Sequence, residues 1–152
     1  MKIKVIGIGN RIMKDDSIGI RIAEALEEAL KELGVEVIIG ETDIEYTLNS
    51  INEGDYIIIL DSSILDLNPG EISIFDIKQL KEFSHKGYSM HQMSLVKILS
   101  CFPFMQIEGI LITVEAADID FGTELSEELT ERFNEIKGRV YEEIKLQVRG
   151  GM

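Results

Sequence analysis

Short apolar runs alternate along this chain with longer segments in which apolar residues recur at helical spacing. The short runs are rich in isoleucine, valine and leucine, a composition typical of buried strands. They predict five strands, at residues 3–8, 35–39, 55–61, 72–76 and 107–116. The third run, DYIIILD, is the most apolar, and such an uninterrupted run indicates a strand that is covered on both faces.

Apolar residues recur every three or four positions in the segments between these runs and after the last one. This spacing predicts helices at about residues 17–33, 44–51, 89–100 and 125–148. Gly34 stands where a helix-ending glycine is expected, and Ser89 and Gln92 fit the capping box of the third helix. Residues 77–90 show no clear period and are expected to be irregular.

Strands separated by helices predict a three-layer α/β/α fold with a mostly parallel sheet. The connection between the third and fourth strands is shorter than the dozen or so residues that a parallel crossover needs. The fourth strand is therefore expected to run antiparallel to the others. The length of 152 residues favours a single domain over residues 1–152.

The amino-acid composition argues against several classes of function. The formal net charge is −13 and no cluster of lysine and arginine stands out, which argues against nucleic acid and against an anionic membrane surface. No apolar run approaches the ~20 residues of a membrane span, and the N-terminus lacks the pattern of a signal peptide, so a cytoplasmic protein is expected. Cys101 is the only cysteine, which excludes a disulfide framework.

The segment GIGNRI after the first strand invites a dinucleotide-binding interpretation. Gly7 and Gly9 match two glycines of that fingerprint, but Ile12 occupies the place of the third. Asp15 and Asp16 would also lie beside the bound pyrophosphate and repel it. A flavodoxin-like or Rossmann-like nucleotide site is therefore the weakest of the alternatives.

Carboxylates gather where two expected strands end. Asp15 and Asp16 precede the first helix, where one of them suffices as a helix cap and leaves the other free for another role. Asp61 ends the most apolar strand. Ligands of open α/β sheets bind outside the carboxyl ends of the strands, so this acidic loop and Asp61 are expected to face each other.

His91 is the third candidate. It falls in the first turn of the helix that Ser89 is expected to cap, where the helix dipole keeps an imidazole neutral and able to bind a metal. On its own, a histidine in such a place is an ordinary surface residue. Two carboxylates and one imidazole together make a suitable three-ligand site for a divalent cation.

Nucleophilic alternatives have less support. If one helix joins His91 and Cys101, the two lie ~15 Å apart along its axis and point in different directions, which argues against a thiol protease. Cys101 is expected to be a buried apolar residue. Ser62 and Ser63 lack the G-x-S-x-G context of a serine nucleophile.

Taken together, these segments resemble the [NiFe]-hydrogenase maturation endopeptidase family. GIGNRIMKDDSIG resembles the family's first signature, G-N-x-x-x-x-D-(D/E)-x-x-G, and IIILDSSILDLNPGEISIFD resembles its central strand, aspartate and Asn-Pro-Gly turn. MHQMSL resembles its histidine segment. The order and spacing of the matches extend over nearly the whole chain.

The resemblance implies a protease that removes a C-terminal extension from the [NiFe]-hydrogenase large-subunit precursor after nickel insertion. The family's metal-binding and catalytic residues fall on Asp16, Asp61 and His91. It also implies a five-stranded mixed sheet of order 2-1-3-5-4. Nickel would arrive with the precursor, so no tightly bound metal is expected in the free enzyme, which we expect to be a monomer.

One segment departs from the family pattern. The family has Gly-Gly-Thr or Gly-Gly-Ser after the second strand, whereas this chain has Gly40, Glu41 and Thr42. Glu41 thus replaces a small residue in a segment expected near the cleft. The departure bears on substrate specificity and leaves open a paralogue with altered activity. A second hypothesis is a binding module that docks the nickel-loaded precursor without cutting it.

Overall fold

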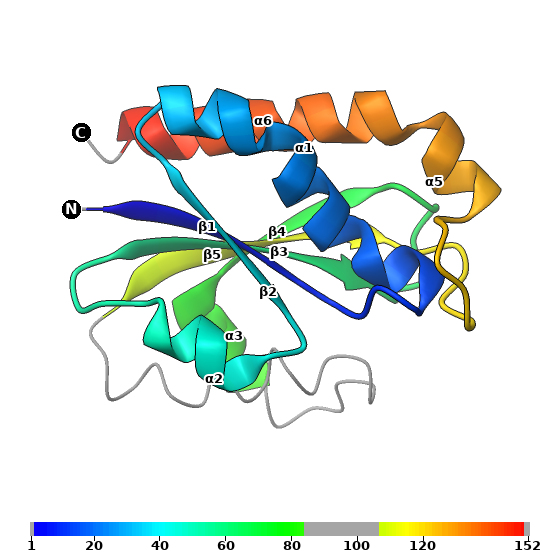
Figure 1. Ribbon diagram of the computed structural model, residues 1–152, viewed down its shortest axis with the longest axis horizontal. Helices are drawn as coiled ribbons and strands as arrows, with labels where there is room; N and C mark the ends of the chain where they lie inside the picture. The colour runs from blue at the N-terminus through cyan, green and yellow to red at the C-terminus, as the bar shows by residue number, and fades with distance from the viewer. Residues whose placement is uncertain (1, 84–106, 151–152) are drawn as a thin grey trace.

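The computed structural model describes residues 2–83 and 107–150, which form a five-stranded sheet between two layers of helices (Figure 1). The strand order is β2-β1-β3-β5-β4, as the family resemblance implies. The strands are β1 (Ile3–Ile8), β2 (Glu36–Glu41), β3 (Tyr56–Ser63), β4 (Ile72–Asp76) and β5 (Glu108–Glu115). The three-layer α/β/α prediction is confirmed.

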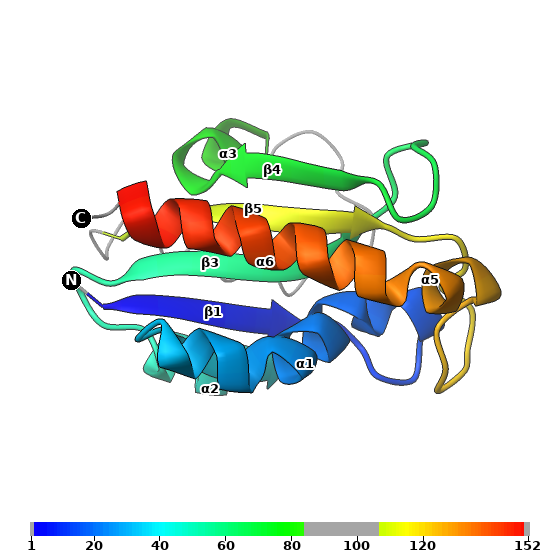
Figure 2. The same ribbon diagram turned by 90° about the horizontal axis from the view of Figure 1, so that it is seen from above.

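The fourth strand runs against the others, as its short connection to the third strand predicts. β1, β2, β3 and β5 pair in parallel, whereas β4 pairs with β5 in antiparallel fashion. Figure 2 shows the arrow of β4 pointing opposite to those of β1 and β5. The carboxyl ends of the four parallel strands therefore share one edge of the sheet.

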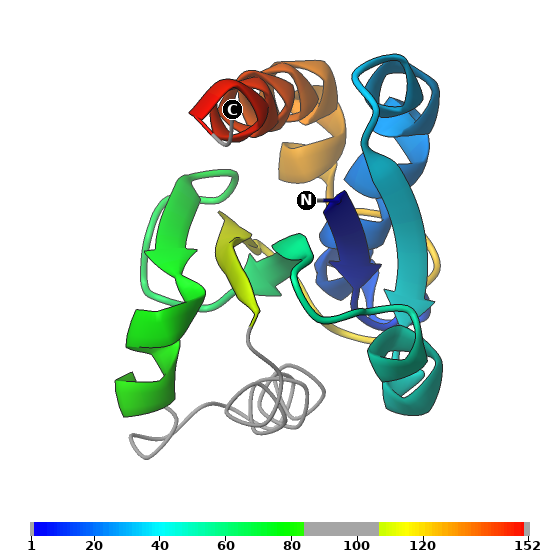
Figure 3. The same cartoon turned by 90° about the vertical axis from the view of Figure 1, so that its left-hand side faces the viewer.

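Helices cover both faces of the sheet. They are the 3-10 helix η1 (Lys14–Ser17), α1 (Ile18–Glu32), α2 (Ile44–Asn49), α3 (Ile77–Phe83), α5 (Glu127–Glu131) and α6 (Phe133–Gly150). The end-on view shows α1 and α6 on one side of the sheet and α2 and α3 on the other (Figure 3). In the described ranges, we find no helix with the length and apolar character to cross a bilayer.

The central strand β3 divides the core into two apolar layers. Ile58 and Leu60 point toward α1 and α6, while Ile57 and Ile59 point toward α2 and α3. All four are at most 2% exposed. This alternation places successive side chains on opposite faces, and it confirms that the strand is covered on both sides.

Residues 77–83 correct the expectation of an irregular segment, because they form α3. Ile77 and Leu80 are buried against β3 and β5, and the Asp76 carboxylate accepts a hydrogen bond from the backbone N–H of Lys78. A helix of seven residues spans two turns, which is too short for periodicity to reveal.

The predicted last helix is two helices, α5 and α6, with a break at Arg132. Leu125 precedes the first of them, which begins after Ser126. At the break, the Arg132 guanidinium donates a hydrogen bond of 2.6 Å to the carbonyl of Pro69, in the turn before β4. This contact with a distant turn cannot be read from the local periodicity. The helix expected over 89–100 lies outside the described residues.

Candidate active site

The carboxyl edge of the sheet brings together two of the three predicted site residues. Asp61 lies near the end of β3, and Asp16 lies in η1, which follows the loop after β1. Asp16 is 7% exposed and Asp61 is 3% exposed. Burial raises the pKa of Asp61, and the negative charge of Asp16 raises it further. The acidic loop and Asp61 therefore lie at the same edge of the sheet, where the Ser62 hydroxyl next to Asp61 contacts Asp16.

Asp16 is held from two directions. One carboxylate oxygen accepts a hydrogen bond of 2.8 Å from the Ser62 hydroxyl, next to Asp61 on β3. The other accepts one of 2.9 Å from the backbone N–H of Asn10. In a dinucleotide site that loop N–H would face a phosphate. Here it binds a carboxylate, which argues against the nucleotide interpretation.

Two glycines allow the backbone of η1 and α1 to lie close to the ends of β1 and β3. Gly9 has φ +138°, and a Cβ there would lie 2.0 Å from the carbonyl oxygen of Asp16. A Cβ on Gly19 in α1 would lie 2.2 Å from the carbonyl oxygen of Leu60, which precedes Asp61. Any side chain at either position would push η1 or α1 away from the ends of β1 and β3. The glycines therefore hold the acidic turn in place.

Asp61 is buried with little compensation. Within the described residues its one hydrogen bond comes from the backbone N–H of Ser62, at 2.7 Å. Burial raises its pKa well above the usual range, the charge of Asp16 raises it further, and the Ser62 N–H opposes both effects. In the same ranges, neither Asp16 nor Asp61 forms an ion pair with a basic side chain. A bound cation would reverse this unfavourable balance.

Asp15 has a different role from its neighbour. Its carboxylate accepts hydrogen bonds from the backbone N–H groups of Ala117, Asp118 and Ser126, at 2.8, 3.0 and 2.7 Å. The helix-cap interpretation is therefore wrong for Asp15, since α1 begins after Ser17 without a side-chain cap. Asp15 instead fastens η1 to the loop between β5 and α5.

Two polar residues of β5 belong to this edge and were missed in the sequence. Thr113 pairs with Asp61 in the β3–β5 register, and Glu115 pairs with Ser63. The Glu115 carboxylate accepts hydrogen bonds from the Ser63 hydroxyl and from the N–H groups of Leu65 and Leu67. The signal was present, because Thr113 and Glu115 are alternate polar residues in an otherwise apolar run.

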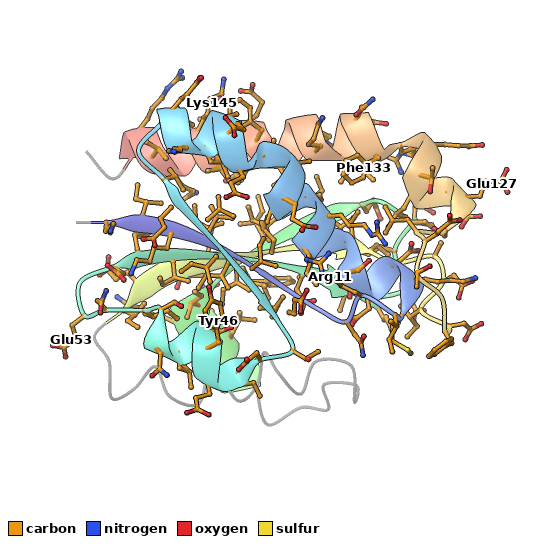
Figure 4. All side chains as sticks on the ribbon, viewed as in Figure 1. Arg11, Tyr46, Glu53, Glu127, Phe133 and Lys145 are labelled. Carbon is orange, nitrogen blue, oxygen red and sulfur yellow. The ribbon has the colours of Figure 1, made fainter. Side chains whose placement is uncertain are left out.

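Glu41 points toward Arg11. Its backbone has φ +52°, its carbonyl accepts a hydrogen bond from the Gly9 N–H, and its carboxylate accepts one from the Arg11 guanidinium. Arg11, which is labelled in Figure 4, also binds Glu24 of α1 through two nitrogens, each at 3.0 Å. The unusual residue in this segment is therefore matched by a basic partner on the neighbouring loop.

The third predicted ligand, His91, lies outside the described residues, and so do Cys101 and Ser89. Its part in the site stays a prediction. Within residues 2–83 and 107–150, no three histidine, cysteine, aspartate or glutamate side chains form a group that could hold a metal ion. The described part of the site is thus a pair of carboxylates, which needs a further ligand to form a complete metal centre.

Comparison with known proteins points to one family. A sequence model of hydrogenase maturation proteases matches residues 20–143. The hydrogenase 2 maturation protease of Escherichia coli is 33% identical over 106 residues, and a hydrogenase expression/formation protein of Rhizobium leguminosarum is 31% identical over 106 residues. Both matches cover 68% of this chain but only 65% and 52% of the relatives' lengths.

The fold is shared with a solved structure. The hydrogenase maturating endopeptidase HybD of E. coli superposes with a TM-score of 0.79, over 97% of this chain and 94% of that one. The two sequences are 24% identical over this match. At that level of identity, the likeness establishes the architecture alone.

Proposed function

The chain belongs to the hydrogenase maturation protease family, and from that premise we propose that it is an endopeptidase acting on a [NiFe]-hydrogenase large-subunit precursor. The reaction removes the C-terminal extension of the precursor after nickel insertion. In this proposal the nickel of the precursor is bound by Asp16, Asp61 and His91. The observation that carries the proposal is the buried pair Asp16 and Asp61, for which the described residues provide no cation.

The electrostatics of the pair favour a divalent cation. Burial penalises the charged form of Asp61, and the negative charge of Asp16 adds to that penalty. A divalent ion neutralises both, and carboxylate and imidazole ligands suit a first-row metal. Because the described residues hold no third ligand beside the pair, His91 is proposed as the third. Such a shell is incomplete, so the free enzyme is expected to hold metal only loosely, and the precursor's own ligands complete it.

The reaction is hydrolysis of a peptide bond. The oxygen of water adds to the carbonyl carbon, the bond from that carbon to nitrogen breaks, and the released amine takes up a proton. Two routes remain open for activating the water. Either the precursor's nickel polarises the reacting groups, or a carboxylate of the pair acts as general base.

Exposed apolar side chains around the pair support a polypeptide substrate. Ile12 follows β1, Leu65 and Leu67 follow β3, and Phe121 follows β5, so all four lie in loops at the carboxyl edge. These loops are held in place, since Asp15 binds the loop after β5 and Glu115 binds the N–H groups of Leu65 and Leu67. Apolar residues presented in this way are typical of protein-binding surfaces.

A non-cleaving binding module is the alternative that one observation favours. Glu41 stands where the family pattern has a small residue, and it binds Arg11 in the loop that positions Asp16. A precursor docked against this pair could be held in a different register from that of a cleaved substrate. Such a protein would report nickel loading without cutting the chain.

The deciding experiment incubates the protein with nickel-loaded or nickel-free large-subunit precursor and follows the precursor by mass spectrometry. We expect shortening only with nickel present, and no rescue when zinc is added to enzyme and metal-free precursor. Cys101→Ala is expected to remain active. Binding without cleavage would establish the checkpoint alternative, whereas a stoichiometric, chelator-resistant zinc would make the protein a conventional metalloprotease.

A further inference from the structure

Thr113 is a buried polar residue beside Asp61. It lies on β5 directly opposite Asp61 on β3, and it is 1% exposed. The preceding registered pair on this face, Ile59 and Leu111, belongs to the apolar layer under α2 and α3. Because residues two apart on a strand share a face, the side chains of Thr113 and Asp61 both lie on that side of the sheet.

The Thr113 hydroxyl is unusual at this edge. Ser62 and Ser63, its hydroxyl-bearing neighbours on β3, donate to Asp16 and Glu115. By contrast, no hydrogen-bond partner of the Thr113 hydroxyl is found among the described residues. A buried hydroxyl without a partner costs free energy, and valine would fill the same space without that cost. An orphaned group of this kind in a native core calls for an explanation.

Asp61 has a carboxylate oxygen that could accept a hydrogen bond from this hydroxyl group. Within residues 2–83 and 107–150, one carboxylate oxygen accepts the Ser62 N–H and the other oxygen has no donor. Among the described residues, a hydroxyl without an acceptor and a carboxylate oxygen without a donor thus stand on adjacent strands, on the same face and in register. Rotation about side-chain bonds is enough to change their contact, since neither residue has to leave its strand.

We propose that Thr113 is a positioning residue for Asp61, whose hydroxyl donates to the Asp61 carboxylate when that carboxylate binds the cation. The bond fixes the orientation of the carboxylate and leaves its remaining lone pairs for the metal. Groups that hold a metal ligand in this manner commonly contribute 10- to 100-fold to metal affinity or activity, an order-of-magnitude range. The inference rests on the proposed function, because it concerns the same site.

The test compares Thr113→Val with Thr113→Ser. Valine keeps the shape and removes the hydroxyl, while serine keeps the hydroxyl and removes a methyl group. We expect Thr113→Val to unfold thermally at or above the wild-type midpoint in the absence of metal, because it loses an unpartnered hydroxyl. In calorimetry with cadmium chloride its affinity is expected to fall about 10-fold or more, with a similar loss in precursor cleavage. Thr113→Ser is expected to stay within about threefold of wild type in both assays.

Ser73→Ala is the matched control. Ser73 is the register partner of Thr113 on β4, at the other side from Asp61, and it is only half-buried. Its removal is expected to leave cadmium affinity and cleavage within about twofold of wild type. If Ser73→Ala loses as much cadmium affinity and cleavage as Thr113→Val, the loss is not specific to Thr113. That result would overturn the proposal.

Two further results would also overturn it. One is a Thr113→Val variant that binds cadmium and cleaves the precursor as the wild type does. The other is a lowered thermal midpoint in Thr113→Val together with an activity of Thr113→Ser that is as low as that of Thr113→Val. That result would assign Thr113 a packing role. In either case, cleavage by the wild type would show that the proposed function survives. A wild type that neither binds nor cuts the precursor would instead remove the proposed function and this inference together.

Discussion

The two ends of the parallel strands both bury aspartate, but within residues 2–83 and 107–150 only the amino end pairs it with a basic side chain. At the amino end, Asp55 precedes β3, and the Lys4 ammonium lies 2.7 Å from its carboxylate. Lys4 also donates to the carbonyl of Ser50, and the Asn52 N–H donates to Asp55. Both charged side chains are at most 6% exposed. This pair is therefore neutral overall and well hydrogen-bonded.

The carboxyl end buries Asp61 beside a second carboxylate. Among the described residues, the negative charge of Asp16 raises the pKa of Asp61 in the same direction as burial does. The chain can bury a matched ion pair, as Lys4 and Asp55 demonstrate, so the imbalance at Asp61 is not a general property of this sheet. The difference is what the proposed binding of a cation at the carboxyl end would explain.

Breaking the matched pair is expected to have the largest effect on stability. Lys4→Met leaves Asp55 as an uncompensated buried charge, which typically costs about 3–5 kcal/mol. Urea unfolding at pH 7 measures the loss. The double variant Lys4→Met, Asp55→Asn is expected to recover much of it. A loss below about 1 kcal/mol would mean that the pair is not the source of stability at the amino end.

Asp15→Ala is expected to come next, with a loss of about 2–4 kcal/mol. The substitution leaves three backbone N–H groups, of Ala117, Asp118 and Ser126, without their charged acceptor. Urea unfolding again gives the magnitude, and proteolysis within the β5–α5 loop gives the location. An equally stable variant with an intact loop would show that water replaces the carboxylate.

Asp61→Asn is expected to separate stability from function. At pH 7 the variant removes a disfavoured buried charge, so its free energy of unfolding should equal or exceed that of the wild type by about 1 kcal/mol. Cleavage of nickel-loaded precursor should fall below about 1% of wild type, because loss of a ligand exceeds the 10- to 100-fold cost of losing a group that supports one.

Asp66→Asn is the matched control, because Asp66 is an exposed aspartate in the loop after β3. It should cleave the precursor within about twofold of wild type. Full activity in Asp61→Asn would remove Asp61 from the site. A large loss of stability in Asp61→Asn would instead place this aspartate with Asp15 and Asp55, as a structural carboxylate.

The smallest expected effect is a pH dependence with a definite sign. The folded-state pKa of Asp61 lies above its unfolded value, so the folded protein binds this proton more tightly. The resulting stability is fully present below the unfolded pKa, near 3.9, and is lost as pH rises through the folded pKa. The stability of Asp61→Asn relative to wild type should therefore increase from pH 4 toward neutral pH in urea unfolding. A relative stability that decreases over this interval would contradict the raised pKa.

Much of the architecture could be predicted from the sequence. The apolar runs located all five strands, and the short connection before β4 predicted its antiparallel direction. The positions of Asp16 and Asp61 after β1 and near the end of β3 placed both at the carboxyl edge, because parallel strands end together there. These features depend on residues close in sequence, so local patterns were sufficient to find them.

Only the tertiary structure decided which contacts each of two adjacent aspartates makes. Asp15 and Asp16 are chemically identical, but η1 directs one toward the loop after β5 and the other toward Ser62 on β3. The register between β3 and β5 likewise decides that Thr113, whose hydroxyl has no hydrogen-bond partner among the described residues, lies opposite Asp61. The sequence determined which chemical groups reach the carboxyl edge. Their partners depend on contacts between segments far apart in the chain, and those contacts exist only once the sheet has formed.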